Sequence, residues 1–170
     1  MTDYFTSDHH FDHIKILEHC NRPFDTAERM NFAMVERWNS VVSNNDTVYH
    51  LGDFTLNGLD RFNYWSSQLN GNIRIIKGNH DKRWMKNFEE TERISIIPHL
   101  THYENHGINI ILSHYPLLEW EGYYRGYFHI FGHTHCKVSG VGKSFDVGVD
   151  CNNFTPLSLD EVIEKMKGKE

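Results

Sequence analysis

The sequence lacks a long apolar run, and it has no basic segment followed by an apolar stretch at its amino terminus. A membrane-spanning helix needs roughly 20 consecutive apolar residues, and a secretory signal needs a charged and then an apolar segment. Both features are missing, so we expect a cytoplasmic protein that does not enter a membrane.

Cysteine is also scarce. The three cysteines, Cys20, Cys136 and Cys151, are an odd number and form no CxxC pair. This pattern supports neither a disulfide framework nor a thiolate zinc site, and it fits a reduced cytoplasmic interior. We expect Cys136 to be a small, buried and unreactive residue, because no basic neighbour marks it as a nucleophile.

Positive charge is in deficit, with 17 Lys and Arg against 23 Asp and Glu, for a formal net charge of -6. A protein that holds long nucleic acid by neutralising its phosphates needs a clustered excess of Lys and Arg. The balance therefore disfavours a nuclease on long DNA or RNA. The 170 residues and 39% hydrophobic content are those of one compact domain, which we expect to span residues 1–170.

Apolar patterning predicts strands that alternate with helices. Helices are expected at residues 26–44 with Thr26 as N-cap, at 59–69, and at 159–166 with Ser158 or Asp160 as N-cap. Strands are expected at residues 4–6, 46–51, 72–77, 108–112, 127–131 and 144–149. This order indicates an α/β sandwich with some antiparallel pairing near residues 94–113.

Histidine is abundant, with 13 residues, and neutral imidazole is a common metal ligand. Five apolar runs are followed at once by side chains that can bind a metal: Asp8 with His10, Asp53, Asn79 with His80, His114, and His133 with His135. Ligand sites in open α/β sheets form outside the carboxyl ends of the strands, so we expect these groups to converge.

The spacing within two of these groups is informative. Asp8 and His10, like His133 and His135, stand two residues apart, which in extended chain directs both side chains to one face. The glycines before Asp53, Asn79 and His133 suit sharp turns or a close approach to a ligand.

Carboxylate, imidazole and amide ligands favour manganese, iron, zinc or nickel over calcium, and they do not separate these four. Manganese is the first of them that we expect. Two cations about 4 Å apart can activate water and clamp a phosphoryl group. Asp53 stands alone between the other groups and is the candidate bridging carboxylate. His80 would face the substrate as the catalytic residue, with Asp81 fixing its tautomer.

The ordered motifs DxH, GDx, GNHD, a later isolated His and GHTH resemble those of the calcineurin-like metallophosphoesterase superfamily over residues 8–135. The stretches SDHHFDHIKIL and NRPFDTAERM look like a small bacterial or phage subgroup. The resemblance implies a two-sheet β-sandwich flanked by helices. The 170 residues are near the minimum length of that superfamily, so we expect no separate cap domain. The resemblance also implies one metal bound by Asp8, His10, Asp53 and His135, and a second bound by Asp53, Asn79, His114 and His133.

Three further residues are candidates for substrate contact, each with an alternative role. His13 could reach a phosphate or begin a helix, Arg22 could bind an anion or form a surface ion pair, and Arg125 lies in the aromatic segment 120–127. That segment could stack a nucleobase or pack over the sandwich edge. We expect packing or supporting roles for His9, His50 and His129, and solvated positions for His19, His99, His102 and His106.

The sequence thus predicts hydrolysis of a phosphomonoester or phosphodiester by a water activated at a dinuclear metal centre. The expected substrate is small and phosphorylated, with a nucleotide as one candidate. The alternative is a non-catalytic metal-binding scaffold of the same fold that mediates a protein interaction. Exposed aromatic residues are compatible with a homodimer.

Overall fold

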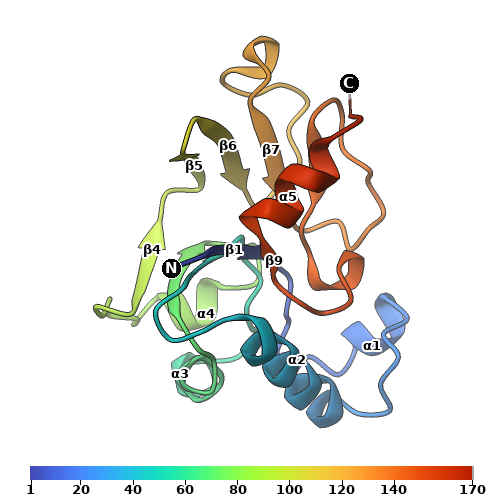
Figure 1. Ribbon diagram of the computed structural model, residues 1–170. Coiled ribbons are helices and arrows are strands. Elements are labelled where there is room, and N and C mark those ends of the chain that lie inside the picture. The colour runs from blue at the N-terminus through green and yellow to red at the C-terminus, as the bar shows by residue number, and fades with distance from the viewer. Residues whose placement is uncertain (170) are drawn as a thin grey trace.

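The computed structural model describes residues 1–169, which form an α/β fold with two mixed β-sheets and helices outside them (Figure 1). The strands are β1 (Asp3–Thr6), β2 (Thr47–His50), β3 (Asn72–Ile76), β4 (Ile94–Ile97), β5 (Leu100–Asn105), β6 (Ile108–Ser113), β7 (Phe128–Phe131), β8 (Ser144–Asp146) and β9 (Leu157–Ser158). The helices are α1 (Ile16–His19), α2 (Ala27–Val41), α3 (Leu59–Ser67), α4 (Lys82–Met85) and α5 (Leu159–Met166), with 3-10 turns η1 (Tyr123–Arg125) and η2 (Val149–Cys151).

The first sheet has the strand order β4-β3-β2-β1-β9. Strands β1 to β4 are parallel, and β9 pairs antiparallel with β1. The second sheet has the order β5-β6-β7-β8, with β6, β7 and β8 parallel and β5 antiparallel to β6. In each sheet, therefore, three or more parallel strands bring their carboxyl ends to one edge.

Two hydrophobic cores hold these layers together. One lies between the first sheet and helices α2 and α3, where Met34, Trp38 and Phe62 pack against Val48 and Ile75. The other contains residues of both sheets, such as Phe5, Ile110 and Ile130, and Val162 of α5. Figure 1 shows α2 and α3 on the side of the first sheet away from β6 and β7. The expected α/β class and flanking helices are confirmed at this level.

Local sequence signals explain where the main helices begin. Helix α2 starts where Thr26 Oγ1 accepts a hydrogen bond from the Arg29 amide at 3.2 Å. Helix α5 starts with a capping box between Ser158 and Glu161, which decides between the two predicted caps in favour of Ser158.

The prediction for the end of α2 was three residues too long. The helix ends at Val41 because Val42 turns into extended backbone and is buried in the core. The carboxylate of Asp46 then accepts the amide of Ser43 at 2.9 Å and organises the turn that leads into β2.

Two strand predictions also need correction. Strand β8 ends at Asp146 rather than at residue 149, because Asp146 Oδ1 accepts the Gly148 amide at 2.7 Å and turns the chain. Antiparallel pairing occurs between β5 and β6, as expected, but β4 pairs parallel with β3. Within residues 1–169, none of the helices has both the length and the apolar character required to span a bilayer.

Candidate metal centre

The expected ligand groups lie where the carboxyl ends of the two sheets meet. The loop after β1 runs beside the loop after β2, with hydrogen bonds from the Asp8 amide to the Gly52 carbonyl at 2.9 Å and from the His10 amide to the Asp53 carbonyl at 3.0 Å. A bridge between Ser7 and Gly148 joins the two sheets at this edge. Backbone pairing therefore gathers loops that lie more than 100 residues apart in the chain.

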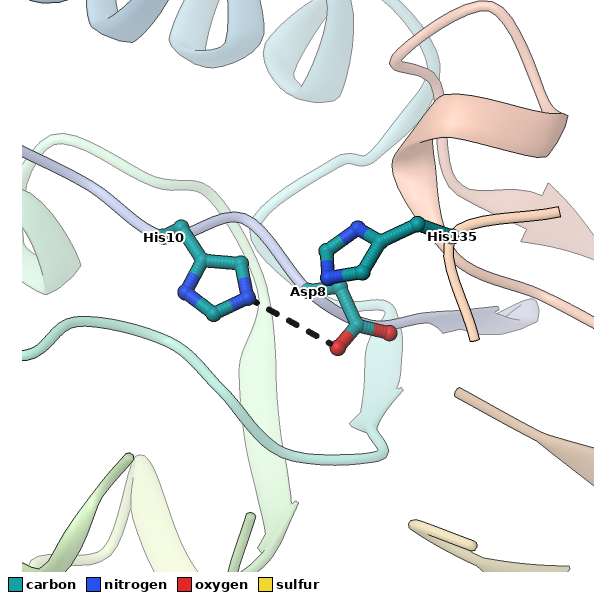
Figure 2. A group of neighbouring side chains, drawn as sticks. All are labelled: Asp8, His10 and His135. Carbon is teal, nitrogen blue, oxygen red and sulfur yellow. Dashed lines mark ion pairs between the residues drawn. The ribbon is translucent and has the colours of Figure 1, made fainter. Parts of the chain in front are cut away.

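Two groups of potential ligands form there. Asp8, His10 and His135 offer donor atoms within 4.8 Å of one another, and so do Asp53, His114 and His133. Figure 2 shows the rings of His10 and His135 on either side of the Asp8 carboxylate, and His10 Nε2 lies 3.9 Å from Asp8 Oδ1.

Asp53 lies between the two groups. Its Oδ2 atom is 3.5 Å from His10 Nε2 and 3.6 Å from His114 Nε2. Asn79 joins the second group, because its Oδ1 atom is 2.9 Å from His114 Nε2. All seven predicted ligands are thus gathered in one place, with one carboxylate positioned to touch both groups.

The backbone at this edge is strained. Five of the seven predicted ligands have left-handed backbone, with φ of 60° at Asp8, 52° at His10, 58° at Asp53, 69° at His133 and 48° at His135. A non-glycine residue in this region costs roughly 1–3 kcal/mol, and such residues concentrate at functional sites. The surrounding structure therefore holds these side chains in place against a local energetic cost.

This conformation corrects the reason given for the two-residue spacing. Asp8 and His10 do share a group, but through left-handed turns rather than extended chain. His133 and His135 do not share a face, since His133 joins Asp53 and His114 while His135 joins Asp8 and His10.

A glycine makes the close packing feasible. A Cβ atom added at Gly78 would lie 2.2 Å from Asp53 Oδ1 and 2.3 Å from the Asp53 amide nitrogen. Any side chain there would displace the candidate bridging carboxylate, as the glycine pattern predicted.

The atoms that face the first group are buried and lack partners, which fits a cation. Within the described part of the chain, residues 1–169, Asp8 Oδ1 and both ring nitrogens of His10 have no hydrogen-bond partner. Burial raises the pKa of Asp8 to about 8, and burial also lowers the pKa of His10 well below its usual range. Burial lowers the pKa of His135, the third member of the group, but hydrogen bonds with Asp150 and Cys20 outweigh burial and raise it to about 10. Without a cation the protonated His135 ring therefore supplies the positive charge beside Asp8, and a divalent cation bound by Asp8 and His10 would take the place of that proton.

The second group also suits a cation. His114 Nδ1 donates to the Leu51 carbonyl at 2.7 Å, so Nε2 presents a lone pair. This lone pair faces Asn79 Oδ1 at 2.9 Å, which is an acceptor too. Burial, and then the neighbouring His114, lower the pKa of His133, which favours the neutral ring that binds metals.

His80 and Asp81 do not form the expected pair. The His80 side chain is exposed and its ring centre lies 5.4 Å from that of His10, at the open side of the first group. The His80 amide donates to Asp53 Oδ1 at 2.8 Å, which helps to fix that carboxylate.

Asp81 is fully buried, and its carboxylate accepts four hydrogen bonds that leave no lone pair for His80. The donors are the amides of Asp53, Phe54 and Gly78 and the indole of Trp84, at 2.8–2.9 Å. The predicted role in fixing the tautomer of His80 is therefore wrong. Asp81 instead holds the loop that carries Asp53.

Arg22 does not face a substrate and is not on the surface. Its side chain is fully buried and pairs with Asp150, at 2.8 Å from Nε to Oδ1. Its remaining donors go to carbonyls of the loop after β1 and to a methionine sulfur. Arg22 therefore forms an ion pair, as one of the two alternatives predicted, but the pair is buried rather than on the surface. Its N–H groups all donate inside the protein, so none is left to bind an anion.

Arg125 lies at the wrong end of the second sheet for substrate contact. It lines a hollow with Gly107, Ile108 and Asn109, at the amino ends of β6 and β7, whereas His114 follows the carboxyl end of β6. Six residues of strand separate these ends by roughly 20 Å. Arg125 instead pairs with Glu121 at 3.6 Å and covers the Tyr127 ring.

The aromatic segment around Arg125 mainly packs on the sheet. The indole of Trp120 is buried, donates to the Tyr127 carbonyl at 3.0 Å, and lies 5.0 Å from the His129 ring. This arrangement favours the packing alternative for the segment. Tyr115 is different, because it is half exposed and its ring lies 4.6 Å from that of His133.

His13 does lie beside the centre. Its ring centre is 5.6 Å from that of His10, and its Nδ1 atom is buried without a partner. The pKa of His13 is lowered, first by partial burial and then by the neighbouring His80 and His19 side chains. Contact with a substrate at this ring is compatible with the geometry.

Asp150 is a site residue that sequence reasoning missed. Its Oδ2 atom accepts a hydrogen bond from His135 Nδ1 at 2.7 Å. Burial alone would raise its pKa, but hydrogen bonds from His135 and Arg22 outweigh burial and lower it. The available signal was its position shortly after β8, in the GVD stretch, which repeats the placement of the other groups behind strands.

The cysteines differ from the prediction as well. Cys136 is exposed rather than buried, and it forms a disulfide with Cys151 across a Cα separation of 5.4 Å. The two cysteines directly follow His135 and Asp150 in the chain, so the disulfide joins the same two loops as the hydrogen bond between those residues. Cys20 is free and lies near His135 and Asp150.

His50 and His129, which lie within strands, and His9, which lies after β1 between Asp8 and His10, have supporting roles, as expected. His9 and His50 are buried and bonded to each other at 3.0 Å. His129 donates to the Ile111 carbonyl at 2.9 Å and accepts the Leu117 amide at 3.2 Å.

Comparisons with known proteins give relatives for nearly the whole chain. The Methanocaldococcus jannaschii protein described as "Uncharacterized protein MJ1445" is 35% identical over 176 residues, which cover 98% of this chain and 92% of that protein. No protein-family model matches the chain.

Two solved structures are also similar. The crystal structure of the protein of unknown function AQ665 from Aquifex aeolicus superposes with a TM-score of 0.76 at 25% identity, over 96% of this chain and 98% of that one. The E. coli phosphoesterase YfcE aligns with a TM-score of 0.38 at 16% identity, over 87% of this chain and 78% of that one. The second likeness is too low to carry an argument.

Proposed function

The chain belongs to the family of the Methanocaldococcus jannaschii protein MJ1445, and from the geometry of its metal-ligand groups we propose that it is a metal-dependent phosphoesterase with a dinuclear centre. The observation that carries this proposal is the position of Asp53. Its Oδ2 atom lies 3.5 Å from His10 and 3.6 Å from His114, which belong to two different ligand groups. A carboxylate shared in this way is what a pair of cations about 4 Å apart requires.

The expected ligands fall into two sets, one for each proposed cation. Asp8, His10, Asp53 and His135 would hold one cation, and Asp53, Asn79, His114 and His133 the other. When bound, the two cations supply an activated water and neutralise charge on the phosphoryl group. The set contains imidazole, carboxylate and amide oxygen but no thiolate, so manganese, iron, zinc and nickel are the metals to test, manganese first.

His80 would act on the substrate. Its backbone is fixed to Asp53 while its side chain is exposed beside His10, so the ring can approach a group bound at the cations. It can donate a hydrogen bond to a phosphate oxygen or a proton to the leaving oxygen. His13, whose ring centre lies 5.6 Å from that of His10, would add a second contact to the same phosphate.

The substrate class follows from charge and surroundings. The chain carries a formal charge of -6, which disfavours long nucleic acid. A small phosphorylated compound is therefore the proposed substrate, and the half-exposed Tyr115 beside His133 offers an aromatic surface to its leaving group.

The experiment measures bound metal and hydrolysis of p-nitrophenyl phosphate and bis(p-nitrophenyl) phosphate with each of the four metals. We expect two bound cations and turnover of at least one compound. His80→Ala should keep both cations and lower kcat by roughly a hundredfold or more, because general acid catalysis contributes about that much. His99→Ala, an exposed histidine at the start of β5, is the matched control and should retain full activity.

Two results would contradict the proposal. A protein that binds no metal under any of these conditions would remove its basis. A protein that binds two cations yet hydrolyses neither compound, nor any member of a panel of nucleotides, cyclic nucleotides, dinucleotides and sugar phosphates, would favour the scaffold alternative.

A further inference from the structure

All the N–H groups of the Arg22 side chain donate hydrogen bonds within one small region. Its five N–H groups reach Asp150 Oδ1 at 2.8 Å, Asp150 Oδ2 at 2.9 Å, the Asp8 carbonyl at 2.7 Å, the His9 carbonyl at 2.8 Å and Met30 Sδ at 3.3 Å. The guanidinium has five such groups and no acceptor, so it is fully satisfied. Arg22 therefore fixes the loop of Asp8 and the side chain of Asp150 together.

Asp150, held by Arg22, in turn fixes the orientation of the His135 ring. Its Oδ2 atom lies 2.7 Å from His135 Nδ1 while both of its oxygens are held by Arg22. A carboxylate accepts only, so Nδ1 must carry the proton and Nε2 is left for the interior of the first group. Figure 2 shows one ring nitrogen of His135 directed at the Asp8 carboxylate and the other directed away from it.

The hydrogen bonds made by Arg22, Asp150 and His135 leave out the atoms that would bind a cation. The carbonyls of Asp8 and His9, the carboxylate of Asp150 and Nδ1 of His135 all have partners. Asp8 Oδ1 and the His10 ring nitrogens have none. Each buried polar atom left without a partner costs about 1–3 kcal/mol, and a cation bound at the first ligand group would supply the partner that these atoms lack.

We propose that Arg22 and Asp150 are positioning residues for the first ligand group, holding His135 Nε2 and the Asp8 loop at the spacing a divalent cation requires. This inference rests on the proposed function only for the presence of the cation. The inference adds two residues to the proposed metal centre. Arg22 and Asp150 form an ion pair, are not expected ligands themselves, and would hold the ligands in place. Partners of this kind orient histidine ligands and raise their basicity.

The disulfide makes the inference testable. Cys136–Cys151 ties the loops of His135 and Asp150 covalently, so these loops stay joined when the Asp150 carboxylate is replaced. A change in metal affinity then reports the orientation of His135 rather than the separation of the loops.

The experiment compares Asp150→Asn and Arg22→Lys with the wild-type protein by calorimetric titration with Mn²⁺. We expect one of the two cations to bind about 10 to 100 times more weakly and the other to be unchanged. Asp150→Glu keeps a carboxylate and should recover part of the loss. Arg61→Lys is the matched control, since Arg61 makes a similar forked pair with Asp12 at 2.7 and 3.1 Å without touching an expected ligand.

A second measurement uses the unmodified protein, so it does not depend on the folding of a variant. Long-range ¹H–¹⁵N spectra of the zinc-loaded protein should show His135 with its proton on Nδ1. A proton on Nε2 of His135 would overturn the inference. So would an Asp150→Asn variant that folds and binds two cations with wild-type affinity. Either result would leave the proposed function standing. Normal metal binding with no phosphoester hydrolysis would overturn the proposed function and leave the inference standing.

Discussion

The histidines inside the strands and the histidines that follow the strands differ in what their ring nitrogens contact. His129, inside β7, donates to one backbone carbonyl and accepts one backbone amide. His10, four residues beyond the end of β1, has a left-handed backbone, and neither of its ring nitrogens has a hydrogen-bond partner among residues 1–169. Both side chains are buried, so burial alone does not separate a packing histidine from a candidate ligand.

The difference teaches that the partners available to a buried ring nitrogen, rather than burial, separate a packing histidine from a candidate ligand. A strand interior offers carbonyls and amides that satisfy an imidazole, whereas the loop beyond it brings side chains of several loops together without backbone partners. If this account holds, replacing a strand-interior group should cost stability, and replacing a loop ligand should cost metal binding.

Asp81 should show the largest effect on stability. It follows a strand, yet all its lone pairs are used, so it behaves as an interior group. Asp81→Ala leaves four buried donors without an acceptor and should lower the free energy of unfolding by roughly 4 kcal/mol in urea denaturation. The exposed Asp25→Ala should change it by less than about 0.5 kcal/mol. A loss below about 1 kcal/mol for Asp81→Ala would contradict this assignment.

His10 should show the opposite behaviour. The wild-type protein should gain about 2.7 kcal/mol per site when free Mn²⁺ is a hundred times its Kd. His10→Ala should be as stable as the wild type without metal but should lose the gain from the first site, which thermal unfolding with and without Mn²⁺ measures. His129→Gln should be less stable than the wild type without metal, but Mn²⁺ should stabilise it by as much as it stabilises the wild type. If Mn²⁺ stabilised His10→Ala as much as the wild type, His10 would not be a metal ligand and would not differ from His129 in the way proposed.

His129 should make stability depend on pH. Burial lowers its pKa to about 4, opposed by its hydrogen bond to the Ile111 carbonyl. Because the folded pKa lies below the unfolded value of about 6.5, its contribution is complete above pH 6.5 and is lost as pH falls toward 4, by about 2 kcal/mol at pH 5. Denaturation of metal-free protein at pH 7 and pH 5 should show a smaller loss for His129→Gln, and an equal loss would refute this role.

The smallest effects belong to the exposed histidines. His99 is exposed, and among the described residues it makes no side-chain hydrogen bond. His99→Ala should change neither the free energy of unfolding, within about 0.5 kcal/mol, nor the number of bound cations. A clear loss of metal on this substitution would mean that the centre extends beyond the strand ends.

Much of the fold was predictable because it depends on short-range patterns. The cap at Thr26 and the spacing of Met30, Met34 and Trp38 indicated α2, and a candidate N-cap at Ser158 or Asp160 indicated α5. The one-turn helices α1 and α4 and the two-residue β9 were missed, because so few residues carry no periodicity.

The ligand set was predictable for a different reason: its members share a position after strands, which is visible in the sequence. Partners of buried charged groups are not visible in this way. Arg22 meets Asp150 across 128 residues, and Asp81 binds backbone amides whose positions depend on the folded loops. Cys136 and Cys151 pair because their loops meet at the first ligand group, and a spacing of 15 residues matches no motif.

The most direct test of the central claim is anomalous diffraction from crystals of the protein loaded with manganese. The account predicts two peaks about 4 Å apart. Asp53 should contact both, with Asp8, His10 and His135 around one peak and Asn79, His114 and His133 around the other. A single peak, or none at this edge after soaking with excess manganese, would contradict the dinuclear assignment.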